Sequence, residues 1–204
     1  MQKIVVASKN NHKIAEFQAI LSPWKLDVTG LPQGVPESPE HGSSFEANAI
    51  EKAVFYSSFV NGWVLADDSG LCVDALEGRP GIFSARYAGV HGDDAANRQK
   101  LLADLREVPD AARSASFACA IAVFHRGLGE GLVVRSDVLG SILTEEHGEG
   151  GFGYDPLFYH PESGKTFSEL SAEQKNRLSH RAKAVERLMA QWKGEASYAS
   201  LSGE

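Results

Sequence analysis

Two features of the 204-residue sequence predict a mixed α/β fold in which helices flank a largely antiparallel or mixed sheet. A β-branched run at residues 3–7 precedes apolar residues at helical spacing. A segment of alternating polarity at 114–125 predicts a long strand, and the chain returns as a second long strand at 132–142 after the glycine-containing turn 127–131. Hydrophobic residues make up 43% and charged residues 23% of the chain, as in ordinary globular proteins. The sequence has no internal repeat, low-complexity tract or domain linker, so we expect residues 1–204 to form a single domain.

The N-terminal part predicts a strand, a helix, a second strand and a second helix, in that order. The first helix ends at Pro23, and residues 25–29 can form the next strand. A second helix begins near Ser43, where Ser43 and Glu46 have the spacing of a capping box, and continues to about Phe59. The apolar positions that define the first helix are Ile14, Phe17, Ile20 and Leu21.

An acidic segment, Asp67-Asp68-Ser69-Gly70, follows the next predicted strand at 63–66. Another short strand is predicted at 71–73, so we expect the acidic pair on or beside a tight turn. In extended backbone the Asp67 and Asp68 side chains point to opposite faces, and they should therefore have different roles. Two carboxylates at a strand end suit Mg²⁺, which prefers oxygen ligands, although the same residues are also common in solvated turns.

The second half of the chain predicts one helix before the two long strands and a helical region at the C-terminus. Asp93 or Asp94 can cap the first of these helices, which carries Leu101, Leu102 and Leu105. Residues 148–154 are too glycine-rich for regular structure and predict a loop. The C-terminal helical region begins with capping spacing from Ser171 to Gln174.

The spacing of Lys175 and Arg181 predicts a break in the C-terminal helical region. A separation of six residues rotates two side chains by about 120° on a straight helix. Both side chains therefore reach one ligand only if the helix breaks or if they hold different parts of that ligand. Ser179 is a good N-cap residue, so the break is predicted there.

One interpretation of the polar segment from Ser8 to Lys13, which follows the first strand, is that it binds phosphate. Its residues precede a helix N-terminus, where backbone N–H groups and the helix dipole favour anions, and Lys13 adds a positive charge. The alternative is plain scaffold. The sequence contains no Walker loop, no GxSxG or HExxH motif and no zinc-spaced Cys/His set. Carboxylate and magnesium chemistry on a phosphate ester or anhydride is the remaining class.

Base recognition is a possible role of two further segments. Phe152 can stack on a base while Asp155 accepts a hydrogen bond, although aromatic residues in loops also serve in packing. His180 and Arg181 carry donors that can contact an exocyclic oxygen, although such residues on an amphipathic helix are commonly surface residues.

Charge and hydropathy exclude several classes of partner. The formal net charge of −7 argues against a broad nucleic-acid or membrane surface, because both partners require a basic face. The apolar runs are shorter than a membrane span, and no signal-peptide pattern is present, so we expect a cytoplasmic protein. Cys72 and Cys119 stand singly in apolar segments and are expected to be reduced thiols.

Taken together, five ordered motifs resemble the inosine triphosphate pyrophosphatase family, whose members remove non-standard purine nucleotides from the nucleotide pool. The resemblance spans nearly the whole chain. The motifs are Ala7 to Lys13 with Glu16, Phe45 to Ala53, Ala66 to Leu71, Pro80 to Tyr87, and Gly150 to Pro156 followed by Ser179-His180-Arg181.

The resemblance implies an elongated α/β fold with two lobes around a central active-site cleft, and a homodimer. It implies magnesium-dependent hydrolysis of ITP, dITP and XTP to the monophosphate and pyrophosphate. Asp68 is similar to the family's catalytic proton acceptor and metal ligand. The resemblance also implies three sets of substrate contacts. Ser69 contacts the substrate, and the triphosphate is held by Ser8, Lys9, Asn10, Asn11, His12, Lys13 and Lys175. The base is recognised by Phe152, Gly153, Tyr154, Asp155, His180 and Arg181.

One departure from the family pattern concerns the second metal ligand. Many relatives carry a carboxylate immediately before the asparagine of the second helix, where this chain has Ala47, and the acidic residue is Glu46. Glu46 either reaches the metal or completes the capping box with Ser43.

Two alternative functions remain, a Maf-type pyrophosphatase acting on pyrimidine or modified nucleotides, and a non-catalytic nucleotide sensor. Intact Asp67, Asp68 and Lys13 argue against the sensor.

Overall fold

The computed structural model describes residues 2–199, with side chains through residue 192, and its strands form one mixed sheet. The seven strands are hydrogen-bonded in the order β2-β1-β3-β4-β5-β6-β7. β1 pairs in parallel with β2 and β3, whereas β6 pairs antiparallel with β5 and β7. The mixed sheet predicted from the sequence is therefore confirmed. The strands are β1 (Lys3–Val6), β2 (Asp27–Gly30), β3 (Trp63–Val73), β4 (Ser114–His125), β5 (Glu130–Ile142), β6 (Phe158–His160) and β7 (Lys165–Thr166).

Five α-helices accompany these strands within residues 2–199, and their first turns show which sequence signals were correct. Asp93 caps α3, and Ser171 and Gln174 form the predicted capping box of α4. Ser179 separates α4 from α5, which confirms the predicted break. The helices are α1 (Asn11–Leu21), α2 (Phe45–Tyr56), α3 (Asp94–Asp104), α4 (Ala172–Leu178) and α5 (His180–Ala199). None of the helices in this part of the chain is long and apolar enough to cross a membrane.

The described chain divides into two compact units. Unit 1 comprises residues 2–68, 119–136 and 181–199, and unit 2 comprises residues 69–118 and 137–180. The chain passes between the units after Asp68, Ala118, Ser136 and His180. Two of these four points fall inside predicted functional motifs, because Asp68 and Ser69 belong to different units, as do His180 and Arg181.

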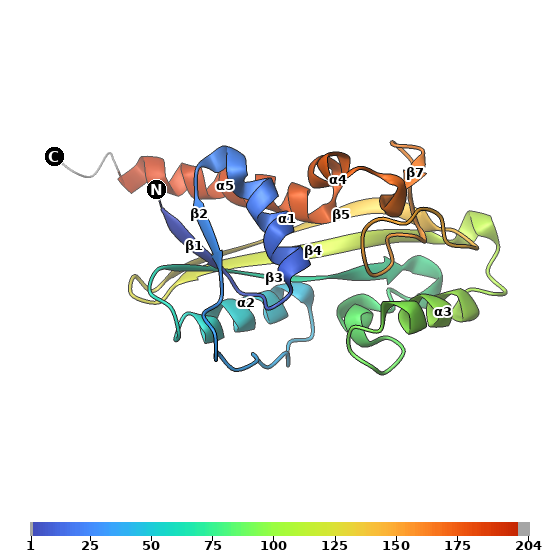
Figure 1. Ribbon diagram of the computed structural model, residues 1–204, viewed down its shortest axis with the longest axis horizontal. Coiled ribbons are helices and arrows are strands. Elements are labelled where there is room, and N and C mark those ends of the chain that lie inside the picture. Colours follow the sequence, from blue (N-terminus) through green and yellow to red (C-terminus); the bar gives the residue numbers. More distant parts are fainter. Residues whose placement is uncertain (1, 200–204) are drawn as a thin grey trace. The chain divides into compact units, whose positions relative to one another are not determined.

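The core of unit 1 lies on one face of its strands. In Figure 1, α1 and α5 cover one face of β1, β3 and the adjoining part of β4, and α2 lies on the other face. The periodic apolar residues of α1 and α5 supply this core, as their spacing predicts. Its fully buried members include Ile4, Phe17, Leu21, Leu65, Cys119, Ile121, Val185 and Leu188.

Unit 2 has a separate core that is rich in aromatic rings. The Phe117 ring lies 4.6 Å from the Phe158 ring and is stacked on Phe167 at 5.7 Å. Leu101 of α3 and Leu105, which caps the C-terminus of this helix, are fully buried. Such packing places the strand and loop residues of this unit on a rigid support.

Two sequence predictions about local structure are wrong. Asp67 to Gly70 form no turn, because β3 continues through them to Val73. Their local turn preference is overridden by burial, since Asp67 is only 4% and Asp68 only 8% exposed and both carboxylates have charged partners. The cap of α2 is Ser44, whose side chain accepts the Ala47 N–H at 3.2 Å, and the expected capping box of Ser43 with Glu46 does not form.

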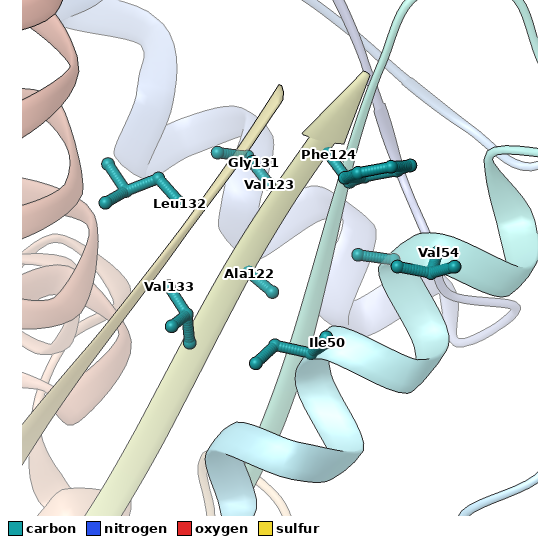
Figure 2. A pocket seen from close by; sticks show the side chains of 9 residues that line it. Ile50, Val54, Ala122, Val123, Phe124, Gly131, Leu132 and Val133 are labelled. Atoms are coloured by element: carbon teal, nitrogen blue, oxygen red, sulfur yellow. The ribbon is translucent and has the colours of Figure 1, made fainter. Parts of the chain in front are cut away.

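An apolar groove of about 210 Å³ lies in unit 1 between α2 and the neighbouring strands β4 and β5 (Figure 2). On α2, Ile50 is 43% and Val54 is 40% exposed. No ionisable side chain lines the groove, so it lacks the groups that hydrolysis requires. Its lining residues are Ile50, Ala53, Val54, Ala122, Val123, Phe124, Gly131, Leu132 and Val133.

Candidate active site

The carboxylates of Asp67 and Asp68 have separate sets of partners in unit 1. Asp67 Oδ2 lies 3.2 Å from Lys13 Nζ of α1 and 3.4 Å from Arg181 Nε of α5. Asp68 instead contacts Asn48 and Lys52 of α2. Because α1 and α5 cover one face of the strands and α2 the other (Figure 1), the two side chains point to opposite faces. The prediction that the two side chains point to opposite faces is confirmed, whereas the prediction that they have different roles stays a prediction.

Asp68 is held by an amide and an ammonium group from α2. Asn48 Nδ2 donates to Asp68 Oδ2 at 3.0 Å, and Lys52 Nζ donates to Asp68 Oδ1 at 3.0 Å. Burial raises the pKa of the Asp68 carboxyl above its ordinary value, and the opposing effects of Lys52 and Asn48 offset this only in part. Asp68 is therefore a stronger proton acceptor than an exposed aspartate.

Lys52 is the central cation of this face. Its ammonium also donates to Glu40 Oε1 at 2.9 Å, so it bridges two carboxylates. Burial lowers the pKa of Lys52, but attraction from the surrounding carboxylates, Asp68 foremost, outweighs burial and raises it. Lys52 is therefore charged at neutral pH and compensates the buried negative charge.

Arg181 joins two acidic side chains on the face of Asp67. Its Nη1 donates to Glu16 Oε2 at 3.1 Å, and its Nε donates to Asp67 Oδ2 at 3.4 Å. The Arg181 and Asp67 side chains are each 3% exposed, and Glu16 is 9% exposed. Arg181 thus orders the acidic residues next to Lys13, a contact that its predicted role toward the base did not include.

The segment from Ser8 to Lys13 forms the predicted loop and helix N-terminus. Ser8 Oγ accepts the Asn10 N–H at 3.1 Å, and Asn10 Oδ1 accepts the N–H groups of His12 at 2.9 Å and Lys13 at 3.4 Å. The idea that these N–H groups are open to phosphate needs correction, because Asn10 caps them. Lys9, Asn11 and His12 are exposed, so the segment presents mainly side chains to a ligand.

In unit 2, residues 152–155 form a tight turn that presents an aromatic ring. The Asp155 N–H donates to the Phe152 carbonyl at 3.2 Å, and Asp155 Oδ2 accepts the Phe152 N–H at 2.8 Å. Gly151 has a φ of 75°, and a Cβ there would collide with the Asp155 carboxylate. The Tyr154 hydroxyl donates to the Ser84 carbonyl at 2.8 Å and anchors the turn.

Lys175 and His180 complete the unit 2 cluster. Lys175 Nζ lies 2.6 Å from Asp155 Oδ2 and 4.6 Å from the centre of the Phe152 ring. The His180 ring stacks on Phe117 at 4.7 Å and is 3% exposed. The structure thus brings Phe152, Asp155 and Lys175 together, whereas Ser69 is placed by β3 as a half-buried residue next to Asp68.

The oxygen atoms around Asp68 fit a hard divalent cation. Asn48 Oδ1 is buried and accepts no hydrogen bond from residues 2–199, and Asp68 and Glu40 add carboxylates on the same lysine. No group of three or more His, Cys, Asp or Glu side chains in this range has metal-site geometry. Mg²⁺ commonly uses only one or two carboxylates and takes its other ligands from water and phosphates, so the donor set suits it.

The Glu46 carboxylate has a different partner. Glu46 Oε1 lies 3.6 Å from Arg135 Nη1, and the same guanidinium lies 5.5 Å from the centre of the Phe45 ring. The Glu46 side chain is 36% exposed and lies in the first turn of α2. Arg135 thus compensates the charge of the Glu46 carboxylate through Oε1.

Sequence reasoning missed the roles of Glu40, Asn48 and Lys52. Asn48 and Lys52 are four residues apart on α2 and share a face with each other, next to the apolar stripe. A lysine beside an apolar stripe, one turn after an asparagine, is the signal that could have identified them. Glu40 lies in an irregular segment, where no periodicity predicts a contact.

The fold and the two groups of polar residues, around Asp68 in unit 1 and around Asp155 in unit 2, define the class of protein. It is a mixed α/β protein whose carboxylate, amide and ammonium groups suit a phosphorylated ligand. The chain belongs to the Ham1 family, whose model matches residues 4–191. The family resemblance expected from the sequence motifs is thereby confirmed.

Several relatives of known structure or name are similar over nearly their whole length. A dITP/XTP pyrophosphatase from Geobacillus kaustophilus is 48% identical over 194 residues, covering 94% of this chain and 95% of the relative. The Staphylococcus aureus Ham1 protein aligns with a TM-score of 0.83 and 43% identity, covering 95% of this chain and 100% of that chain. A Ham1 protein from Coxiella burnetii aligns with a TM-score of 0.85 and 40% identity, also covering 95% of this chain and 100% of that chain.

Proposed function

We propose that this protein hydrolyses the non-standard purine nucleoside triphosphates ITP, dITP and XTP to the monophosphate and pyrophosphate, and so removes them from the nucleotide pool. The observation that carries the proposal is the buried Asp68 carboxylate, with its raised pKa, held between Lys52 and Asn48. The names of relatives such as the dITP/XTP pyrophosphatase of Geobacillus kaustophilus support the substrate class.

The phosphates are assigned to cationic and polar groups. Ser8, Lys9, Asn10, Asn11, His12 and Lys13 contact the triphosphate, with Lys13 drawn into place by Asp67 at 3.2 Å. Magnesium, when bound by Asp68 and Asn48 Oδ1, with Glu46 as a further candidate, supplies positive charge that neutralises the phosphate oxygens. Lys175 is also assigned to the triphosphate, while its contacts with Phe152 and Asp155 link it to the base-binding turn.

Asp68 is the catalytic proton acceptor. Water attacks the α-phosphorus, its proton passes to the Asp68 carboxylate, and the bond from that phosphorus to the bridging oxygen of pyrophosphate breaks. The raised pKa of Asp68 favours this transfer. Lys52 stabilises the carboxylate form of Asp68 before the reaction, and Ser69, the next residue of β3, contacts the substrate.

The base is assigned to the cluster of unit 2, with Arg181 as an additional contact. Phe152 stacks on the purine, and Gly153, Tyr154 and Asp155 shape the turn that carries it. His180 donates to the 6-oxo group of hypoxanthine or xanthine, whereas adenine would place its own donor there. This difference favours purines that carry a 6-oxo group over adenine.

We further propose a cytoplasmic homodimer. Dimerisation is implied by the family resemblance, and the apolar groove of unit 1 offers a surface for a second copy of this chain (Figure 2). Its exposed members Ile50 and Val54 would lose contact with water on association.

A substrate panel tests the proposed function. ITP, XTP, dITP, ATP, GTP and UTP are incubated with the protein with and without magnesium, and pyrophosphate release is measured. Efficient release from ITP, XTP and dITP only with magnesium supports the proposal. Preferred turnover of UTP would favour the Maf-type alternative, and binding of ITP without turnover would favour a sensor.

A further inference from the structure

We infer that Asp94 and Arg98 of α3 are positioning residues for base recognition, because together they hold the turn that carries Phe152. The inference rests on the proposed base-binding role of residues 152–155. Asp94 and Arg98 lie one helical turn apart in unit 2, so their side chains leave α3 from the same face. Neither residue belongs to the motifs that carry the family resemblance.

Both backbone polar groups of Gly153 are bound by this pair. Asp94 Oδ2 accepts the Gly153 N–H at 2.8 Å, and Arg98 Nη1 donates to the Gly153 carbonyl at 2.9 Å. The N–H belongs to the peptide plane before Gly153 and the carbonyl to the plane after it. Two contacts from a rigid helix therefore fix the orientation of both planes.

We call Asp94 and Arg98, with their two contacts to Gly153, the clamp. The conformation of Gly153 explains why the turn needs these contacts. Its φ is 62°, and glycine enters that region without steric cost but also leaves it easily. A free glycine at this position would let the turn adopt several shapes. Charged partners on both sides restrict it to the one in which Asp155 binds the Phe152 N–H.

The clamp is itself held in place. Arg98 Nε donates to Glu146 Oε1 at 2.8 Å, and the Arg98 side chain is only 18% exposed. The guanidinium is therefore oriented before any ligand arrives. Its effect passes to Phe152 and Asp155, and from Asp155 to Lys175 at 2.6 Å. Asp94 and Arg98 thus determine where the aromatic ring and its carboxylate meet a base.

Steady-state kinetics with ITP tests the inference. Arg98→Ala and Asp94→Ala should each raise KM about tenfold and change kcat less than about twofold, since each removes one charge-assisted hydrogen bond to Gly153. Asp94→Asn keeps an acceptor oxygen, and Arg98→Lys keeps a donor, so both should recover much of the affinity. The double alanine variant should show less than the product of the single effects.

Matched controls separate positioning from general damage. Lys100→Ala removes the ion pair with Asp104 at 3.0 Å on the same helix and should leave KM unchanged. Inorganic tripolyphosphate contains no base and meets the turn only through Lys175, so Arg98→Ala should weaken its inhibition much less than it weakens the binding of ITP. Equal losses of tripolyphosphate and ITP affinity, or a fall in kcat without a rise in KM, would overturn the inference.

Phe152→Ala distinguishes the inference from the function on which it rests. If Phe152→Ala raises KM for ITP but the alanine variants of Asp94 and Arg98 do not, the clamp is wrong and the base-binding turn stands. If Phe152→Ala leaves KM unchanged, the base-binding role fails, and the inference fails with it. Thermal unfolding of each variant confirms that the kinetics are measured on folded protein.

Discussion

Lys52 Nζ lies 3.0 Å from Asp68 Oδ1, although the two residues are sixteen positions apart in the chain. The same ammonium lies 2.9 Å from Glu40, so one lysine compensates two carboxylates. On the opposite face, Lys13 and Arg181 compensate the negative charge of Asp67. The protein thus holds two adjacent aspartates in buried positions because each carboxylate has its own cationic partners.

Substitution of Lys52 should move the pH profile as well as the rate. In the proposed reaction Asp68 acts as a carboxylate, so kcat/KM should fall as the pH falls through its pKa. That pKa is already raised by burial, and Lys52 lowers it in part. Lys52→Met should therefore shift the acid limb of kcat/KM to higher pH and reduce kcat/KM at neutral pH by about 100-fold.

The matched control for this experiment is Lys3→Met, which removes an exposed lysine from β1 and should leave the profile unchanged. An acid limb that stays in place, or moves to lower pH, in Lys52→Met would contradict the assigned role of Lys52.

Asp68→Asn should retain the fold and abolish turnover, because the amide keeps the shape of the side chain but accepts no proton. A loss of about 10³-fold or more in kcat is expected. Asp27→Asn, an exposed change in β2, is the control. Circular dichroism checks folding, and pyrophosphate release checks turnover. Retained activity would transfer the proton-acceptor role to Asp67 or Glu46.

Arg181→Ala should destabilise the protein by about 3–5 kcal/mol, since it leaves Asp67 and Glu16 buried without their shared cation. The free energy of unfolding is measured in urea. Arg177→Ala, which breaks an exposed pair with Glu173 on α4, should change it by less than about 1 kcal/mol. Similar small effects of both variants would show that the buried network does not contribute as described.

The proposed dimer predicts that Val54→Asp yields monomers in sedimentation experiments, because it places a charge in the apolar groove. Val90→Asp changes an exposed apolar residue outside the groove, 65% exposed, and should leave the dimer intact. A wild-type protein that is monomeric at high concentration, or a dimer that survives Val54→Asp, would remove the groove from consideration as the interface.

Local signals in the sequence predicted much of the fold. The first strand, loop and helix, the mixed sheet, and the break at Ser179 follow from periodicity, capping and turn chemistry, which act over a few residues. The turn expected at Asp67 to Gly70 did not form, because partners far away in the sequence stabilise the extended backbone.

The candidate site was predictable at its acidic centre but not in its supporting contacts. The alternation of side chains along a strand correctly assigned Asp67 and Asp68 to different faces. The links from Lys52 to Glu40 and from Arg98 to Gly153 depend on how separate segments pack, and no short-range pattern encodes them. Glu46 was considered from its position in α2 alone, whereas Arg135, which contacts it, comes from β5.

The position of water attack tests the central claim most directly. ITP is hydrolysed in ¹⁸O-labelled water, and the products are analysed by mass spectrometry. Attack at the α-phosphorus predicts one labelled oxygen in the monophosphate and none in pyrophosphate. Label in pyrophosphate, or labelled orthophosphate as the first product, would contradict the proposed reaction.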